Sequence, residues 1–239
     1  RLYCTLNKRI KLIMAYTTIP KPSAYFNTNL YTGNDTADTT ITGVGFQSDF
    51  TWIKSRTTTE NHHAFDAVRG GGYRIYPNLA DAQSYIATTL TSWTSDGFVV
   101  GTDDGVNANG ANFVSWNWKA GTTSGIATNA TTTITPTGYS FNQTNGFSAI
   151  AYTGNGVDGA YLPHGLGKSP KVMIVKRLED SAAWYVYHAS MGNQKYMQLS
   201  TNAAISATDG MWGSFTPDTV NMKMSNDAQI GASGKNYIM

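Results

Sequence analysis

The chain has 239 residues, with 17 basic and 15 acidic side chains and a single cysteine. One cysteine excludes a disulfide framework and a cysteine-based zinc site. No run of about 18 apolar residues occurs, so the sequence predicts no membrane-spanning helix.

Residues 1–13 differ in composition from the rest of the chain. They contain the only cysteine, no acidic residue and four basic residues, Arg1, Lys8, Arg9 and Lys11. We expect Met14 to be the native start and residues 1–13 to be a non-native upstream extension, since they lack the apolar core of a signal peptide. Without those four basic residues the balance is 13 basic against 15 acidic, or −2. Binding to nucleic acid then has no support from net charge.

Aromatic and β-branched residues are common and helix formers are sparse, which predicts an all-β protein. Short β-rich runs between turn residues predict strands at 50–54, 97–101, 113–118, 171–176, 184–188 and 195–199. Only residues 78–84 resemble a helical turn or two.

The run at 113–118 alternates with period two. This pattern places Phe113, Ser115 and Asn117 on one face of a strand. It places Val114, Trp116 and Trp118 on the other.

The chain contains an internal repeat at an offset near 120 residues. The segment at 31–34 returns at 152–155, and Lys54 corresponds to Lys176. Residues 103–114 align on residues 227–238, where the second copy stops short of a counterpart to 115–121. We therefore expect two copies of one structural module, with the natural chain continuing past Met239.

The repeat predicts four segments. We expect residues 1–13 to be the extension, 14–121 a first β-sandwich repeat, 122–137 a polar linker and 138–239 a second repeat, truncated at its C-terminus. We favour two jelly-roll or lectin-like sandwiches in tandem. One concanavalin-like sandwich with internal pseudo-symmetry is the alternative.

The sequence resembles a domain of unknown function found, often in tandem, in virion proteins of tailed bacteriophages, especially marine phages. The resemblance covers about residues 14–239, with matching segments at 14–23, 26–28, 31–33, 43–54, 65–70 and 106–110. It implies a tail-fibre or other virion-surface protein with lectin-like modules, made in the bacterial cytoplasm, and it carries over no catalytic residues. It further implies contacts with other virion proteins and a homo-oligomer.

One segment has the composition of a calcium loop. Carboxylate and carbonyl oxygens on a tight turn suit Ca²⁺, and the candidate ligands are Asp103, Asp104, Asn107 and Asn109. The favoured alternative is a turn in which Asp and Asn side chains bond their own backbone, because the second copy keeps only one acid.

The histidines and the acidic residues give weaker evidence for a functional site. His62 and His63 are adjacent, so on a strand they point to opposite faces and cannot share one ion. A glycosidase needs two positioned carboxylates, and the acids available for such a pair are Glu60, Asp66, Asp96, Asp103 and Asp104. We predict no catalytic residue.

Aromatic residues are the stronger candidates for binding, because sugars stack on aromatic faces. The six tryptophans mostly recur between the copies or alternate on strands, so we assign most of them to core packing. Tyr73, Tyr76 and Tyr85 lie in a less repeated stretch and are the predicted binding surface.

These patterns and the resemblance leave three functions as expectations. The first is a non-enzymatic phage adhesion protein that presents a surface to bacterial glycans, without membrane insertion. The second is a glycan-cleaving enzyme on a concanavalin-like fold. The third is a purely architectural capsid or tail decoration.

Overall fold

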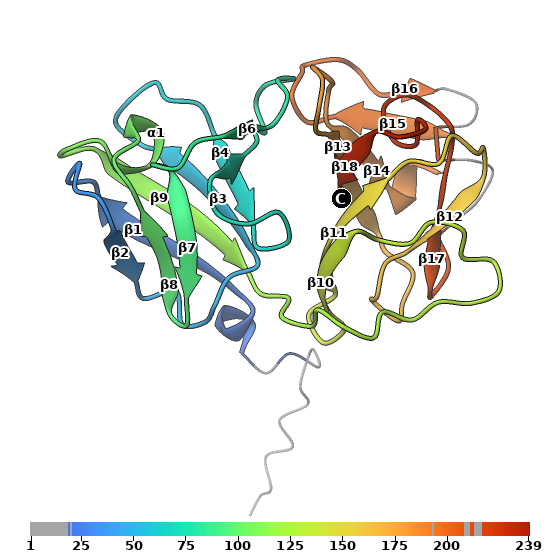
Figure 1. The fold of residues 1–239 in the computed structure, drawn as a ribbon, viewed down its shortest axis with the longest axis horizontal. Helices are drawn as coiled ribbons and strands as arrows, with labels where there is room; N and C mark the ends of the chain where they lie inside the picture. Colours follow the sequence, from blue (N-terminus) through green and yellow to red (C-terminus); the bar gives the residue numbers. More distant parts are fainter. Residues whose placement is uncertain (1–18, 20, 193, 208–210, 213–216) are drawn as a thin grey trace, which may run out of the picture.

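The computed structural model describes residue 19 and residues 21–239, except 193, 208–210 and 213–216. Over these residues the protein is all-β, with several antiparallel sheets and little helix, which confirms the predicted class. The elements form two lobes that lie side by side (Figure 1), which we call the N-terminal lobe (22–118) and the C-terminal lobe (138–238). The predicted extension at 1–13 lies outside the described residues.

Two antiparallel sheets enclose the core of the N-terminal lobe, in strand orders β1-β9-β3-β4 and β2-β8-β7, and β5 pairs with β6 beside them. Inward side chains from both sheets, among them Ile53, Phe98 and Phe113, have no exposed surface. This arrangement is that of a β-sandwich. The elements are η1 (Pro22–Ala24), β1 (Phe26–Thr32), β2 (Thr39–Thr42), β3 (Phe50–Ser55), β4 (His63–Asp66), β5 (Tyr73–Arg74), β6 (Ser84–Tyr85), β7 (Leu90–Thr94), β8 (Gly97–Val100), α1 (Asp104–Asn107) and β9 (Asn112–Trp118).

The C-terminal lobe has a sheet in the order β10-β11-β18-β13-β14-β15-β16 and a separate pair, β12 with β17. Its core includes Tyr152, Tyr187 and Trp212. The elements are β10 (Gly138–Asn142), β11 (Phe147–Thr153), β12 (Ala160–Pro163), β13 (Val172–Arg177), β14 (Tyr185–His188), η2 (Ala189–Met191), β15 (Lys195–Gln198), β16 (Ser206–Ala207), β17 (Asn221–Met224) and β18 (Asn236–Ile238). No helix in the described ranges has the length and apolar character needed to cross a bilayer.

The six strands predicted from the sequence correspond to β3, β8, β9, β13, β14 and β15. The helical turn predicted at 78–84 is wrong. The Leu79 N–H bonds the Tyr76 carbonyl in a turn, and Ala80 and Gln83 hydrogen-bond through their backbones to Ala182 and Leu178 of the other lobe, so that no helix forms. The single α-helix in the described part of the chain begins after Asp103, whose side chain accepts a hydrogen bond from the Gly105 N–H as an N-cap.

Strand order matches between the lobes. β9 lies between β1 and β3 in one lobe, and β18 lies between β11 and β13 in the other. The lengths differ, because β9 pairs with β1 over seven positions whereas β18 pairs with β11 over three.

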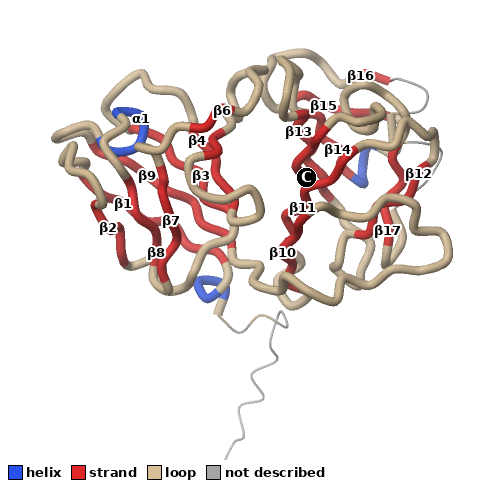
Figure 2. Tube along the Cα trace, viewed as in Figure 1, coloured by secondary structure: helices blue, strands red, loops and turns tan. Residues whose placement is uncertain are grey.

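The predicted linker at 122–137 contains no helix or strand, as the loop between β9 and β10 in Figure 2 shows. It packs closely on the C-terminal lobe. Ile134 is buried in that core, and Thr132 Oγ1 lies 2.9 Å from Asn221 Oδ1. The segment therefore adds to the C-terminal core.

The two lobes share an apolar contact. Ala64 and Ile75 pack there against Leu178, Trp184 and Ile238. The indole N–H of Trp184 donates to the carbonyls of Tyr76 (2.9 Å) and Leu79 (3.2 Å), so one side chain joins the lobes by packing and by hydrogen bonds.

Lys176 adds a polar link. Its buried ammonium donates to the Ala80 carbonyl of the N-terminal lobe at 3.3 Å and to the Arg177 carbonyl at 2.7 Å. Burial, together with the charge of Arg177, lowers the pKa of Lys176 to about 8.

We expect Trp184→Ala to lower the free energy of unfolding by about 3–5 kcal/mol, because it leaves a cavity in the contact. Calorimetry should then show two thermal transitions, one for each lobe. Trp184→Phe is the matched control, which keeps an aromatic ring and loses the N–H, and it should cost about 1–2 kcal/mol. One transition at the wild-type midpoint for Trp184→Ala would show that the lobes do not depend on this residue.

Candidate functional site: an aromatic cleft between the lobes

Three tryptophans lie on the outward face of the sheet β1-β9-β3-β4. In β9 the residues Phe113, Ser115 and Asn117 are buried, which confirms the predicted alternation. The opposite face therefore carries Trp116 and Trp118, both half-buried, and β3 places Trp52 beside them. We call Trp52, Trp116 and Trp118 the tryptophan platform.

Cross-strand pairing fixes the geometry of the platform. Trp52 lies directly opposite Trp116 in the β3–β9 register, with ring centroids 6.1 Å apart at an interplanar angle of 76°. The Trp52 indole N–H donates to His62 Nδ1 at 3.0 Å. Burial lowers the pKa of His62, and the nearby charge of Lys54 lowers it further, so the imidazole remains an acceptor at neutral pH.

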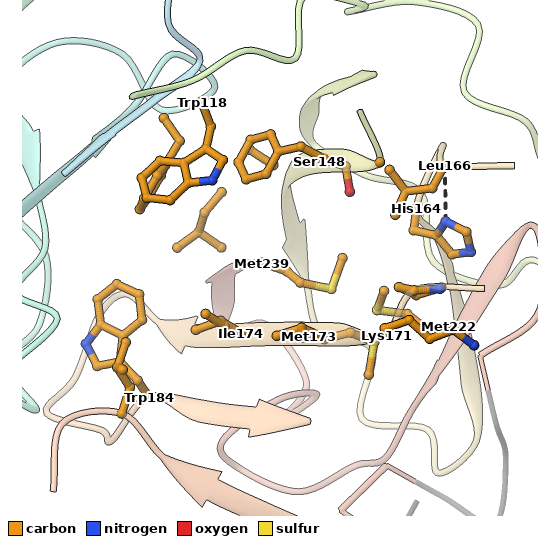
Figure 3. Close-up of a pocket in the computed structure, with 18 of the residues that line it drawn as sticks. Trp118, Ser148, His164, Leu166, Lys171, Met173, Ile174, Trp184, Met222 and Met239 are labelled. Carbon is orange, nitrogen blue, oxygen red and sulfur yellow. Dashed lines mark hydrogen bonds between the residues drawn. The ribbon is translucent and has the colours of Figure 1, made fainter. Parts of the chain in front are cut away.

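Two residues of the platform, Trp52 and Trp118, line a cavity of about 690 Å³ between the lobes. Figure 3 shows Trp118 and Trp184 on one side of this cavity, Met239 near its middle and, on the far side, His164, Leu166 and Met222. The ring of Trp118 stacks on Phe147 of the C-terminal lobe, with centroids 6.2 Å apart and 22° between the planes. Side chains from both lobes thus form one aromatic cleft.

Polar side chains in the cleft are few. The described residues that line it include no Asp or Glu, and the polar side chains are Gln143, Ser148, His164, Lys168, Ser169 and Lys171. Desolvation lowers the pKa of His164, whose Nε2 lies 3.1 Å from the Asp218 carbonyl oxygen. The cleft offers stacking surfaces and hydrogen-bond donors to a neutral polar ligand.

The structure brings together two of the three predicted binding tyrosines. Tyr73 and Tyr85 pair across β5 and β6 with centroids 5.0 Å apart, and they are 38% and 60% exposed. Tyr76 lies apart from them, half-buried, with its ring edge-on to His63 and beneath the Arg74 guanidinium. The pair forms a small second aromatic surface outside the cleft.

Two of the four predicted calcium ligands, Asp103 and Asn107, have other partners. Asp103 caps α1 and forms a 3.0 Å ion pair with Arg74. Asn107 is fully buried, and its amide bonds the carbonyls of Gly101 and Thr36, while Asp104 and Asn109 are exposed. No group of three or more His, Cys, Asp or Glu side chains gathers as metal ligands in the described part of the chain. The calcium site stays a prediction.

The two adjacent histidines point apart, as expected. His62 bonds Trp52 on the outward face, whereas His63 is 2% exposed on the inward face. Neither ring nitrogen of His63 has a hydrogen-bond partner among the described residues, and burial lowers its pKa to about 3. A Cβ at Gly105 would come within 2.3 Å of this ring, so the first turn of α1 closes over it.

Assigning the tryptophans to core packing is correct for Trp184 and Trp212. It is wrong for the platform, which lies on the outward face and not in the core. The available signal was the alternation in β9. It implied that one face carries two tryptophans and the other Ser115 and Asn117, but hydrophobicity favoured burial of the tryptophans. The lobe core accepts the polar pair because Asn117 Nδ2 bonds Ser115 Oγ at 3.0 Å.

One family model matches the chain, over residues 21–239, and it describes a domain of unknown function, DUF7483. No curated protein and no solved structure matches the chain.

We expect the stability of the wild type to fall as pH drops below 6.5, because His63 binds a proton in the unfolded chain before it does so in the fold. His63→Phe removes this contribution. Between pH 7.5 and pH 5, the free energy of unfolding of the variant should therefore fall by about 2 kcal/mol less than that of the wild type. Urea denaturation from pH 5 to 8 measures the difference, with His188→Gln as the control histidine. Parallel pH profiles for wild type and His63→Phe would contradict the assignment.

Proposed function

The chain belongs to the DUF7483 family, and from its site we propose that it is a non-catalytic, carbohydrate-binding protein of a phage virion surface. The ligand is a bacterial cell-surface glycan, held in the aromatic cleft. The observation that carries this proposal is the tryptophan platform on the outward face of a rigid sheet.

A tryptophan on the solvent face of a sheet leaves apolar surface in water, and this costs free energy unless a ligand or a partner covers that surface. The solvent face of an antiparallel sheet is ordinarily polar, because apolar side chains gain nothing there. β3 and β9 instead place three large aromatic rings on that face, and two of them, Trp52 and Trp118, line the cavity. Ring faces bind the apolar C–H face of a sugar, and cross-strand pairing holds these rings without further ordering cost.

The lining favours binding over cleavage. A two-carboxylate hydrolase places a pair of acids beside the scissile bond. Among the described residues, the cavity wall supplies amide, hydroxyl and amino groups from Gln143, Ser148 and Lys168 instead. Such groups hydrogen-bond sugar hydroxyls and orient a ligand.

The virion setting rests on the resemblance of the sequence to virion proteins of tailed bacteriophages. A tail-fibre protein that contacts other virion proteins and forms a homo-oligomer would present many copies of a weak site. Multivalent binding then raises avidity by orders of magnitude without any new contact.

We expect Trp52→Ala and Trp118→Ala, at the two platform residues that line the cavity, each to weaken binding to bacterial surface polysaccharides about five- to thirtyfold, because each removes a stacking face worth about 1–2 kcal/mol. A glycan array first identifies the ligand, and titration calorimetry then gives the dissociation constants. Val157→Ala, at a 55% exposed apolar position in the C-terminal lobe, is the matched control and should bind as the wild type does.

A second variant distinguishes the two aromatic surfaces. Tyr85→Ala removes the more exposed ring of the Tyr73–Tyr85 pair and should leave binding unchanged. Loss of binding in Tyr85→Ala with retention in Trp52→Ala would move the site to the tyrosine pair. No saturable binding of the folded protein to any array glycan would instead favour a purely architectural role.

A further inference from the structure

The outward face of the sheet β1-β9-β3-β4 extends beyond the cavity. The C-terminal lobe packs on this face at β4 and at the end of β9, where Trp118 stacks on Phe147. The described lining of the cavity accordingly includes Trp52 and Trp118 and stops short of Trp116. The rest of the face lies on the middle of β9 and on β1, which is on the side of the N-terminal lobe away from the C-terminal lobe (Figure 1).

Apolar side chains continue over this part of the face. In the β1–β9 register Thr28 lies opposite Trp116, and Leu30 lies opposite Val114. Leu30 is 59% exposed and Phe26 is 41% exposed. Contiguous apolar surface of this kind marks a binding site more often than a single exposed apolar residue does. We call Phe26, Thr28, Leu30, Val114 and Trp116 the β1–β9 surface.

The aromatic rings of the β1–β9 surface adjoin those of the cavity wall. The ring centroids of Phe26 and Trp118 are 4.8 Å apart, and those of Trp116 and Trp52 are 6.1 Å apart. Trp118 and Trp52 both line the cavity. A ligand that extends from the cavity across β9 therefore passes from one ring directly onto the next.

The polar groups beside these rings are uncharged. The outward positions of β1 and β9 carry Phe, Thr, Leu, Asn, Val and Trp, with no acidic or basic side chain among them. The Thr32 hydroxyl on this face donates to Asn112 Oδ1 at 3.1 Å. Aromatic faces with neighbouring hydroxyl and amide groups suit a neutral sugar. A polyanion such as nucleic acid is instead bound mainly through basic side chains.

The spacing of the strands suits a chain of sugars. Neighbouring strands lie about 4.8 Å apart, which is close to the length by which a linear pyranose chain advances with each unit. Two such steps lead from Trp52 on β3 across β9 to Leu30 on β1. The β1–β9 surface therefore has room for about two sugar units outside the cavity.

We propose that the ligand is a linear, neutral polysaccharide, bound over several consecutive units that run from the cavity onto the β1–β9 surface. This inference rests on the proposed function and adds to it the class of glycan, a chain as opposed to a single terminal sugar. Trp116 stacks on one outer unit, and Leu30 with Val114 covers the next. Affinity then rises with the length of the chain, because each added unit brings a further contact.

The test compares short and long oligosaccharides of one linkage. The probes are maltose and maltohexaose, cellobiose and cellohexaose, and the dimer and hexamer of chitin, and titration calorimetry gives their dissociation constants. If the glycan array identifies a different polysaccharide, the size-fractionated dimer and hexamer of that polysaccharide are used in the same way. Light scattering gives the mass of each protein.

We expect the hexamer of a bound series to bind at least tenfold more tightly than its dimer. Trp116→Ala should lower this ratio of affinities about tenfold, and Leu30→Ala about threefold. Ile205→Ala, at a 55% exposed apolar position in the C-terminal lobe, is the matched control for Leu30→Ala and should leave the ratio unchanged.

Equal affinities for dimer and hexamer, or a ratio that neither Trp116→Ala nor Leu30→Ala lowers, would overturn the inference and leave the proposed function standing. A wild-type dimer that Leu30→Ala dissociates would also overturn it, since a second copy of the chain would then cover the β1–β9 surface. Absence of binding to every oligosaccharide and to the glycan array would instead overturn the proposed function itself.

Discussion

The fold depends on one strand that returns late in each lobe to pair between two earlier ones. In the N-terminal lobe β9 is hydrogen-bonded to β1 and β3, although some 80 residues separate β1 from β9. Closing so long a loop is entropically costly, and pairing on both edges of β9 offsets that cost. Tyr31 stacks on Phe113 across this pairing with centroids 5.1 Å apart, and Tyr152 stacks on Tyr237 at the same distance in the other lobe.

The same strand determines what the outward face presents. Once Phe113 is fixed inward by the Tyr31 stack, the period of two leaves no choice for Trp116 and Trp118. They face outward, and the second lobe, held by Trp184 and Lys176, forms the other side of the cavity that Trp118 lines. The cleft is therefore a consequence of register in one lobe and of docking between the two.

Much of the secondary structure was predictable from local pattern. The strands β3, β8, β9, β13, β14 and β15 follow β-rich runs between turn residues, which act over a few neighbours. The short segment at 78–84 was not predictable, because its backbone bonds residues about 100 positions away and these contacts override its weak helical tendency. Likewise, the segment at 103–109 has the composition of a set of oxygen ligands, yet Asp103 pairs with the distant Arg74 and the Asn107 amide bonds the carbonyls of Thr36 and Gly101.

The sequence by itself determined an all-β chain, the alternation of β9 and the absence of a disulfide framework, because composition and period are local properties. Only the tertiary structure decided which face of β9 is buried, since that depends on whether Asn117 finds partners inside the lobe. It also decided that Tyr73 and Tyr85 meet while Tyr76 turns to His63. Such contacts join distant segments, and no short window of sequence contains them.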